Sequence, residues 1–296
     1  MLSLLAKHRL CYFLSFAFCF IFICLPGHTS NKRILIMGDS WAEGMTVFGA
    51  VQHVLDRYGF SHIEATGTRT AIGGTKAERW AKNWKGHLDI LRDELEKNPA
   101  IDIVFMTLGG NDFLSLAMRE NLAQLTSEQR MAAWQTICAD LKAVIDAIKS
   151  VRPTIRVLLC DYDYLEPERM TATYQLQFHG ISPEQMNTAL VELAKEKRKL
   201  MAAYPDCGYV QNFGLLQYTF GNGDTIKPGS VCPPGKAPDY EPFPGGDIRY
   251  PSGRDAMPDG VHPVPRAYIT IVENCFSQFL YTWLLETERR EVATSR

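Results

Sequence analysis

Asp259 and His262 lie in the segment Asp259-Gly260-Val261-His262-Pro263, and together they offer general-base chemistry. An imidazole is the usual base for a serine hydroxyl because it changes charge near neutral pH. A carboxylate beside it fixes the ring tautomer and stabilises the imidazolium. The three-residue spacing lets both side chains come from one loop. Taken alone, the segment is equally consistent with a surface His–Asp pair, so the prediction depends on a nucleophile elsewhere in the chain.

Ser40, in Gly38-Asp39-Ser40, is the best candidate for that nucleophile. The tripeptide follows the apolar run 33–37 and opens an amphipathic stretch. The hydroxyl is therefore expected at a strand end, at the positive end of a helix dipole. A serine at this place is also a common helix N-cap. The G-x-S-x-G elbow is excluded, because Ala42 stands where that motif needs glycine. Asp39 is expected to hold the turn through backbone hydrogen bonds.

Two glycine-containing segments offer donors for an oxyanion. Gly74 lies in Ile72-Gly73-Gly74-Thr75, and its backbone N–H is one candidate. Asn111 lies in Leu108-Gly109-Gly110-Asn111-Asp112, and its side-chain amide is the other. The alternative interpretation gives neither segment a catalytic role: the first is then a strand-to-helix connection, and the second is an Asn-Asp turn that caps a helix.

The elements that must position these residues alternate between strand and helix. Short apolar runs predict five strands, at residues 33–37, 63–65, 101–108, 155–160 and 208–213. Amphipathic periodicity and capping residues predict five helices, at residues 40–58, 76–97, 127–152, 183–203 and 265–285. This alternation predicts a three-layer α/β/α domain with a central, mainly parallel five-stranded sheet. Ligands bind at the carboxyl ends of strands in such sheets, where three of the four motifs fall.

Taken in order, the four motifs resemble the SGNH (GDSL-like) hydrolase superfamily, from about residue 33 to residue 285. The resemblance implies its flavodoxin-like fold, with Ser40 as nucleophile and with Asp259 and His262 completing the triad. It implies an oxyanion hole formed by Ser40, Gly74 and Asn111, and no metal or other cofactor. Trp41 stands where the family often has a smaller aliphatic residue, and we expect Trp41 and Asp112 to contact the substrate.

Substrate specificity is less well determined by the sequence. Residues 214–258 form a long Gly- and Pro-rich loop with little periodicity. Its aromatic residues suit stacking on sugars, although local packing explains them equally well. We therefore expect a short-acyl (acetyl) esterase of carbohydrates. The alternatives are a lipase or lysophospholipase, a thioesterase, an O-acetyltransferase acting on cell-envelope polysaccharide, or a glycan-binding module without activity.

The first thirty residues predict a secretory signal peptide. Lys7 and Arg9 precede an apolar run, residues 10–25, and residues 26–30 break it. The run is shorter than the roughly 20 residues of a spanning helix, and an uncleaved anchor is the alternative. Residues 31–296 are then one domain, secreted or periplasmic, with no stable membrane insertion after cleavage.

Charge and cysteine content set further expectations for the mature chain. It has 29 basic and 33 acidic residues once Lys7 and Arg9 are removed, a net charge of about −4, so a nucleic-acid partner is not expected. An exported chain can form disulfides, and five cysteines leave at least one unpaired. Cys207 with Cys232 is the predicted bridge, and Cys138 and Cys160 are expected to be core thiols, with Cys275 as the fifth.

Overall fold

A computed structural model describes residues 31–294 of the chain. Five parallel strands form one sheet in the order β2-β1-β3-β4-β5. Their bounds are β1 (Asn31–Gly38), β2 (Ile63–Thr66), β3 (Ile103–Thr107), β4 (Arg156–Cys160) and β5 (Cys207–Val210). The predicted five-stranded α/β fold is therefore confirmed, and every strand pair is parallel. The leader predicted at residues 1–30 lies outside the described residues.

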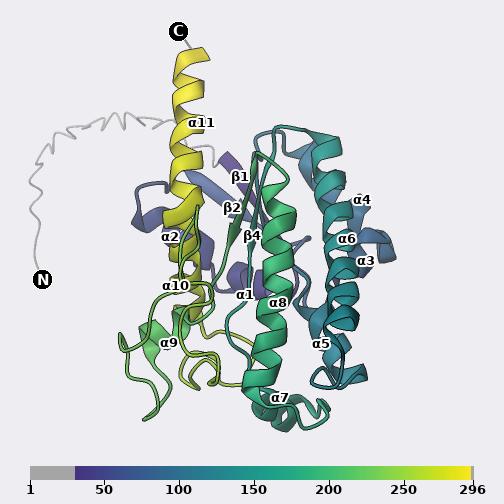
Figure 1. The fold of residues 1–296 in the computed structure, drawn as a ribbon. Helices are drawn as coiled ribbons and strands as arrows, with labels where there is room; N and C mark the ends of the chain where they lie inside the picture. Colours follow the sequence, from purple (N-terminus) through teal and green to yellow (C-terminus); the bar gives the residue numbers. More distant parts are fainter. Residues whose placement is uncertain (1–30, 295–296) are drawn as a thin grey trace, which may run out of the picture.

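Helices cover both faces of the sheet (Figure 1). One face carries α1 (Ser40–Val47), α2 (Ala50–Arg57) and α10 (Pro265–Cys275). The other carries α3 (Ala77–Ala81), α4 (His87–Lys97), α5 (Gly110–Arg119), α6 (Ser127–Val151) and α8 (Pro183–Ala202). The sheet between them is almost wholly buried, as expected when both faces are packed.

The remaining helices lie toward the two ends of the molecule. Two short ones, α7 (Pro167–Tyr174) and α9 (Leu215–Phe220), lie with the long loop at the end opposite the C-terminus (Figure 1). A π-helical turn, Phe276–Leu280, joins α10 to α11 (Tyr281–Thr294), which extends beyond the sheet at the other end. Among the described residues, no helix is both long enough and apolar enough to cross a bilayer.

Two long helices begin where their capping residues predict. Thr126 accepts from the Gln129 N–H, and the Gln129 side chain accepts in return from the Thr126 N–H. Ser182 and Gln185 form the same reciprocal capping box before α8, with Pro183 as its first residue. Each pair satisfies two of the backbone donors that a helix start leaves open.

Several predicted elements are divided in the structure. The helix predicted over 40–58 is interrupted at Phe48–Gly49, because glycine is a poor helix former. The helix predicted over 76–97 is interrupted by a short 3₁₀ helix, Trp84–Gly86. There the side-chain oxygen of Asn83 accepts from the N–H groups of Leu88 and Asp89 and so starts α4.

The loop predicted over 214–258 contains a helix, α9, that no local pattern indicates. Its start is capped from a distant part of the chain. The buried carboxylate of Asp163, just after β4, accepts from the N–H groups of Gly214 and Leu216. Burial raises the pKa of Asp163 to about 7, although these backbone N–H groups oppose the rise.

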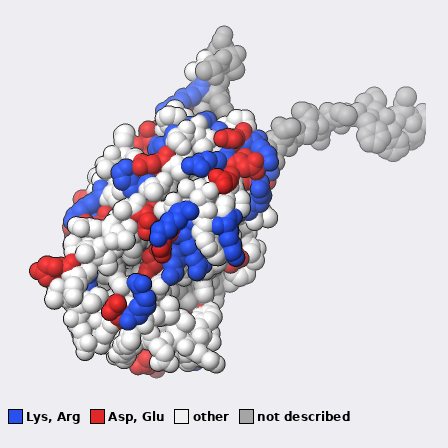
Figure 2. Space-filling model, turned by 90° about the vertical axis from the view of Figure 1, so that its right-hand side faces the viewer, with Lys and Arg blue, Asp and Glu red and all other residues white. Residues whose placement is uncertain are grey.

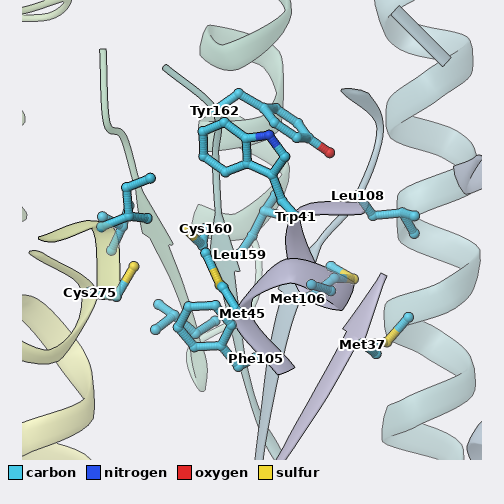
Figure 3. Packing of buried hydrophobic residues seen from close by; sticks show 14 of the residues in the cluster. Met37, Trp41, Met45, Phe105, Met106, Leu108, Leu159, Cys160, Tyr162 and Cys275 are labelled. Atoms are coloured by element: carbon cyan, nitrogen blue, oxygen red, sulfur yellow. The ribbon is translucent and has the colours of Figure 1, made fainter. Parts of the chain in front are cut away.

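The predicted Cys207–Cys232 bridge is wrong for this structure. All five described cysteines are free; Cys207 is half-buried at the start of β5, whereas Cys232 is exposed in the long loop. Spacing alone cannot bring two such positions together, since a disulfide requires Cα atoms within about 7 Å. Cys160 and Cys275 are buried in the core (Figure 3), which confirms the prediction for Cys160.

Candidate active site

The order of the strands places two of the predicted motifs next to each other. In a sheet ordered 2-1-3-4-5, the connections leave β1 and β3 toward opposite faces, which opens a crevice between their carboxyl ends. Gly38 at the end of β1 lies opposite Thr107 at the end of β3. Ser40 follows Gly38 by two residues, and Asn111 follows Thr107 by four. Both side chains line one small cavity at this crevice.

The turn before Ser40 is tightly constrained. Gly38 has a φ of +130°, and a Cβ at this position would lie 1.8 Å from the carbonyl oxygen of Thr107, so only glycine fits. Asp39 is the N-cap of α1 and accepts from the Trp41 N–H at 3.1 Å. Ser40 thus becomes the first helical residue, with its N–H among the donors that a helix start leaves open.

Ser40, His262 and Asp259 come together as the sequence predicts. The Nε2 of His262 lies 2.9 Å from the Ser40 Oγ. The Nδ1 of the same ring lies 2.7 Å from the Asp259 Oδ2. An ionised carboxylate can only accept, so Nδ1 carries the proton and Nε2 is free to accept from the hydroxyl. The arrangement has the geometry that general-base activation of a serine requires.

Asp259 is oriented by its own loop. Its Oδ1 accepts from the backbone N–H groups of Val261 and His262, at 2.9 and 2.7 Å. Partial burial favours the neutral acid, but these bonds and those from the His262 ring and the Tyr174 hydroxyl outweigh it and hold the pKa of Asp259 well below its usual range. The group is therefore a carboxylate at neutral pH. The His262 side chain is 35% exposed, so water can reach the ring.

Three donors without a protein acceptor among residues 31–294 lie around this crevice: the N–H groups of Ser40 and Gly74, and one amide proton of Asn111. The other amide proton of Asn111 is donated to the Thr75 carbonyl at 3.0 Å. Thr75 in turn donates its hydroxyl to the Gly38 carbonyl at 3.1 Å. This chain of bonds ties both predicted oxyanion segments to the turn that carries Ser40.

Trp41, the residue after the candidate nucleophile Ser40, is buried, with 1% of its surface exposed. Its indole N–H donates to the Val261 carbonyl at 2.8 Å, which connects α1 to the loop that carries His262. Its ring meets Tyr162 edge to face, with centroids 5.1 Å apart (Figure 3). Trp41 also lines the cavity beside Ser40, together with Phe113, Leu114, Leu165 and Leu190. The volume of this cavity is about 10 Å³.

Asp112 has a structural contact that the sequence does not indicate. Its carboxylate accepts from the N–H groups of Ala77 and Glu78, at 2.7 and 3.2 Å, and so caps α3. It also lines a larger polar cleft of about 450 Å³ between α3, α5 and α6. Its predicted role as a substrate contact remains a prediction.

Asp39 lies in a buried network that sequence reasoning missed in part. Besides the Trp41 N–H it accepts from the hydroxyls of Thr107 and Tyr162, and Tyr162 accepts from the Gly110 N–H at 2.9 Å. Burial raises the pKa of Asp39 to about 6, and the three hydrogen bonds oppose the rise. The network joins the strand ends of β1, β3 and β4 and holds the Asp39 carboxylate against Thr107 and Tyr162.

Helix α7 is the part of the site that none of the four sequence motifs indicates. Its last residue, Tyr174, places its hydroxyl 2.6 Å from the Asp259 Oδ2 and 3.1 Å from the His262 Nδ1. Arg169 donates to the carbonyls of Met257 and Ser252, at 2.8 and 2.7 Å. Only Glu166-Pro167, an N-cap followed by a proline, marks the start of this helix in the sequence. No local sequence pattern connects Tyr174 with Asp259, which lies 85 positions further along the chain.

The charges on the face formed by α3, α4 and α6 are mixed. Figure 2 shows basic and acidic side chains interspersed over the face formed by the helices on the right of Figure 1. Within residues 31–294, no cluster of three or more His, Cys, Asp or Glu side chains is arranged to hold a metal ion.

Fold and geometry together define a class: a doubly wound α/β protein with a Ser–His–Asp constellation at the switch point of its sheet. Comparison with protein families gives the more specific assignment. The model of the GDSL-like Lipase/Acylhydrolase family matches residues 36–268, which is more than half of the chain. The chain therefore belongs to this family of ester-hydrolysing enzymes.

Solved structures resemble the chain at low sequence identity. One is a protein from Streptococcus pneumonia, provisionally described as a platelet activating factor. It is 15% identical, with 86% of each chain covered and a TM-score of 0.53. A family 3 carbohydrate esterase from Clostridium thermocellum is 17% identical over 85% of this chain and 96% of its own, with a TM-score of 0.45. An extracellular lipase from Streptomyces rimosus is 18% identical over 82% and 98%, with a TM-score of 0.44. A search of curated proteins finds no match. At 15% identity, the likeness to the streptococcal structure shows a shared fold.

Proposed function

We propose that the protein is a secreted serine esterase that removes short acyl groups, mainly acetyl, from carbohydrates. The observation that carries this proposal is the hydrogen-bonded series from Ser40 through His262 to Asp259, with contacts of 2.9 and 2.7 Å, beside a cavity the size of a methyl group.

In the acylation step, His262 Nε2 takes the Ser40 proton as Oγ forms a bond to the ester carbonyl carbon. The oxyanion accepts from the N–H groups of Ser40 and Gly74 and from the free amide proton of Asn111. Asp259 stabilises the imidazolium. The tetrahedral intermediate then collapses, the bond to the alkoxy oxygen breaks, and His262 returns the proton to the departing alcohol.

The deacylation step repeats this sequence with water. His262 takes a proton from a water molecule as its oxygen attacks the acyl-serine carbonyl, and it then protonates Ser40 as the carboxylic acid leaves. Water can approach because the imidazole is partly exposed. A sugar hydroxyl in place of water would make the same intermediate a donor for acetyl transfer.

The size of the cavity beside Ser40 favours a short acyl group. Its volume of about 10 Å³ is roughly the space of one water molecule, which is close to that of a methyl group. Its walls are mostly apolar side chains, which suit a methyl group and not a charged one. A longer acyl chain would require Leu114, Leu165 or Leu190 to move.

The nature of the larger cleft favours a polar alcohol. Lys76 and Asp112, the residues directly after Thr75 and Asn111, both line it. Its other walls carry further charged side chains: Glu78, Lys82, Arg119 and Asp140. Such a surface can bond the hydroxyls of a sugar, whereas it would not solvate a lipid chain.

The aromatic residues of the long loop support sugar binding less than the sequence suggests. The Tyr240 hydroxyl donates to the Tyr209 carbonyl, and Phe243 packs edge to face on Phe213. Both rings therefore serve local packing. Tyr218 is one aromatic residue of this loop that is exposed, at 39%.

Export is part of the proposal because residues 1–30 combine a basic start, an apolar middle and a small-residue exit. We propose that cleavage leaves residues 31–296 as one domain.

The experiment is a panel of p-nitrophenyl esters of increasing chain length, followed by acetylated and deacetylated glycans. We expect kcat/KM to be highest for acetate and to fall by at least tenfold at butyrate, and we expect acetate release from the glycans. A preference for octanoate or longer would assign a lipase instead. Acetylated glycan product without free acetate would assign an acetyltransferase.

A further inference from the structure

We propose that Tyr174 is a positioning residue of this site, holding Asp259 and His262 together on the side of the imidazole that faces away from Ser40. The inference rests on the proposed function, because it concerns the base of the same reaction. It adds a fourth residue, contributed by α7, to the Ser–His–Asp set that the motifs indicate.

The geometry consists of three short contacts that form a closed triangle. Tyr174 Oη lies 2.6 Å from Asp259 Oδ2 and 3.1 Å from His262 Nδ1, and the latter two atoms lie 2.7 Å apart. The phenol and imidazole rings are nearly perpendicular, at 84°, with centroids 6.0 Å apart. The phenol therefore meets the ring at its edge, at the nitrogen that Ser40 does not use.

The donors in the triangle follow from the chemistry of the groups. The carboxylate can only accept, so the Tyr174 hydroxyl donates to Asp259 Oδ2. A lone pair of the phenol oxygen then faces the Nδ1–H of His262, which divides its hydrogen bond between Asp259 and Tyr174. The Nδ1 atom lies 2.7 Å from Asp259 Oδ2 and 3.1 Å from Tyr174 Oη, so its hydrogen bond to the carboxylate is the stronger of the two.

The position of Tyr174 is fixed, although the residue is 43% exposed. Helix α7 is fastened to the Asp259 loop at its other end, where Glu166 N–H donates to the Gly260 carbonyl at 3.0 Å. Gly260 has a φ of +87°, and a Cβ there would lie 2.6 Å from the Glu166 carbonyl oxygen. The two segments therefore approach as closely as their backbones permit. Arg169 adds the two bonds to this loop described above.

The phenol remains a neutral donor over the working range of an esterase. Burial and the bond to Asp259 raise the pKa of Tyr174 to about 12. The other titratable groups that face Asp259 are Arg169 on α7 and Tyr268 on α10. Neither makes a hydrogen bond to the carboxylate, so Tyr174 is the side chain that competes with His262 for Oδ2.

Two consequences follow for a Tyr174→Phe variant. Asp259 would direct its whole charge at the imidazolium, so the protonated, inactive form of the base would persist to higher pH. The His262 ring would also lose the contact of its Nδ1 with Tyr174 and keep only the one with Asp259. The imidazole would then be less well oriented toward Ser40, so kcat would fall. A residue with a purely structural role would lower stability and would leave the pH profile unmoved.

The test is the pH dependence of kcat/KM for p-nitrophenyl acetate in the full mature chain. We expect Tyr174→Phe to move the acid limb upward by about half a pH unit. We expect kcat on the plateau to fall roughly three- to tenfold with little change in KM. Tyr281→Phe is the matched control, since this exposed phenol lies on α11 and makes no hydrogen bond to residues 31–294. It should match the wild type in both measurements.

A readout that needs no turnover separates this proposal from the proposed function. In Ser40→Ala protein, the imidazole signals of His262 can be titrated by NMR with and without Tyr174→Phe. An upward shift of the titration midpoint supports the positioning role even if no ester is hydrolysed. Superimposable His262 titrations would overturn it, whether or not the wild type is an esterase.

Discussion

His262 Nε2 lies 2.9 Å from Ser40 Oγ, although 222 positions separate the two residues in the chain. The contact exists because β1 ends at the switch point of the sheet and the segment before α10 returns to the same point. Trp41 connects the two segments, because its indole N–H donates to the carbonyl of Val261, the residue before His262. The first turn of α1 and the Asp259 loop are therefore hydrogen-bonded to each other, and α7 bonds the same loop through Arg169.

Replacing Asn111 by alanine tests the oxyanion donor. Loss of one such donor costs about 3 kcal/mol of barrier, so we expect kcat to fall by roughly 100- to 1,000-fold with a smaller change in KM. Asn98→Ala is the control, because it removes an amide that donates to the Glu94 carbonyl far from the site. A fall in kcat of less than tenfold for Asn111→Ala, in protein as stable as the control, would remove Asn111 from the mechanism.

Leu114→Ala tests whether the small cavity sets the acyl length. Leu114 lines the cavity beside Ser40, and shortening it adds space for about three carbon atoms. We expect the ratio of kcat/KM for butyrate to that for acetate to rise about tenfold, since each buried methylene contributes about 0.8 kcal/mol. Leu116→Ala, two residues along the same helix, is the control, because Leu116 lines the polar cleft instead. An equal change in both variants would show that the cavity does not select the acyl group.

Asp39→Asn tests the state of the buried carboxyl next to the nucleophile. Burial raises the pKa of Asp39 from its ordinary 3.8 to about 6. The folded protein therefore keeps this proton to higher pH than the unfolded chain does, and stability declines as pH rises from about 4 to about 6. We expect the free energy of unfolding of the wild type, minus that of Asp39→Asn, to fall by on the order of 2 kcal/mol over this window and then to level off.

Urea unfolding at half-unit pH steps measures this difference. The remaining titratable groups are common to both proteins and cancel in the subtraction. A difference that stays constant from pH 4 to pH 7 would mean that Asp39 is ionised throughout. Asp39→Asn should also retain most of its kcat, because the carboxyl bonds Tyr162 and Thr107, whereas the His262 ring bonds Ser40 and Asp259.

The sequence predicts those parts of the site whose contacts are local. Asp259 and His262 share one loop, and Ser40 follows a strand that periodicity identifies. The strand order that brings these segments together comes from the family resemblance and not from spacing. Asn111 is predicted as an oxyanion donor, but its bond to Thr75, 36 positions away, is visible only in three dimensions.

The predictions that fail do so where a distant side chain decides the local structure. The first N–H groups of helix α9 are capped by the carboxylate of Asp163, some 50 positions earlier in the chain. Tyr174 acquires its role from a loop that it meets only in the folded protein. The predicted Cys207–Cys232 bridge fails because the number and spacing of cysteines do not determine their burial or their position in the fold.

The most direct test of the central claim is labelling with a fluorophosphonate, followed by peptide mapping. The account predicts one adduct per chain, on Ser40, with labelling lost in Ser40→Ala and slowed by at least a hundredfold in His262→Ala at unchanged thermal stability. An adduct on a different serine, or ester hydrolysis that persists in Ser40→Ala, would contradict it.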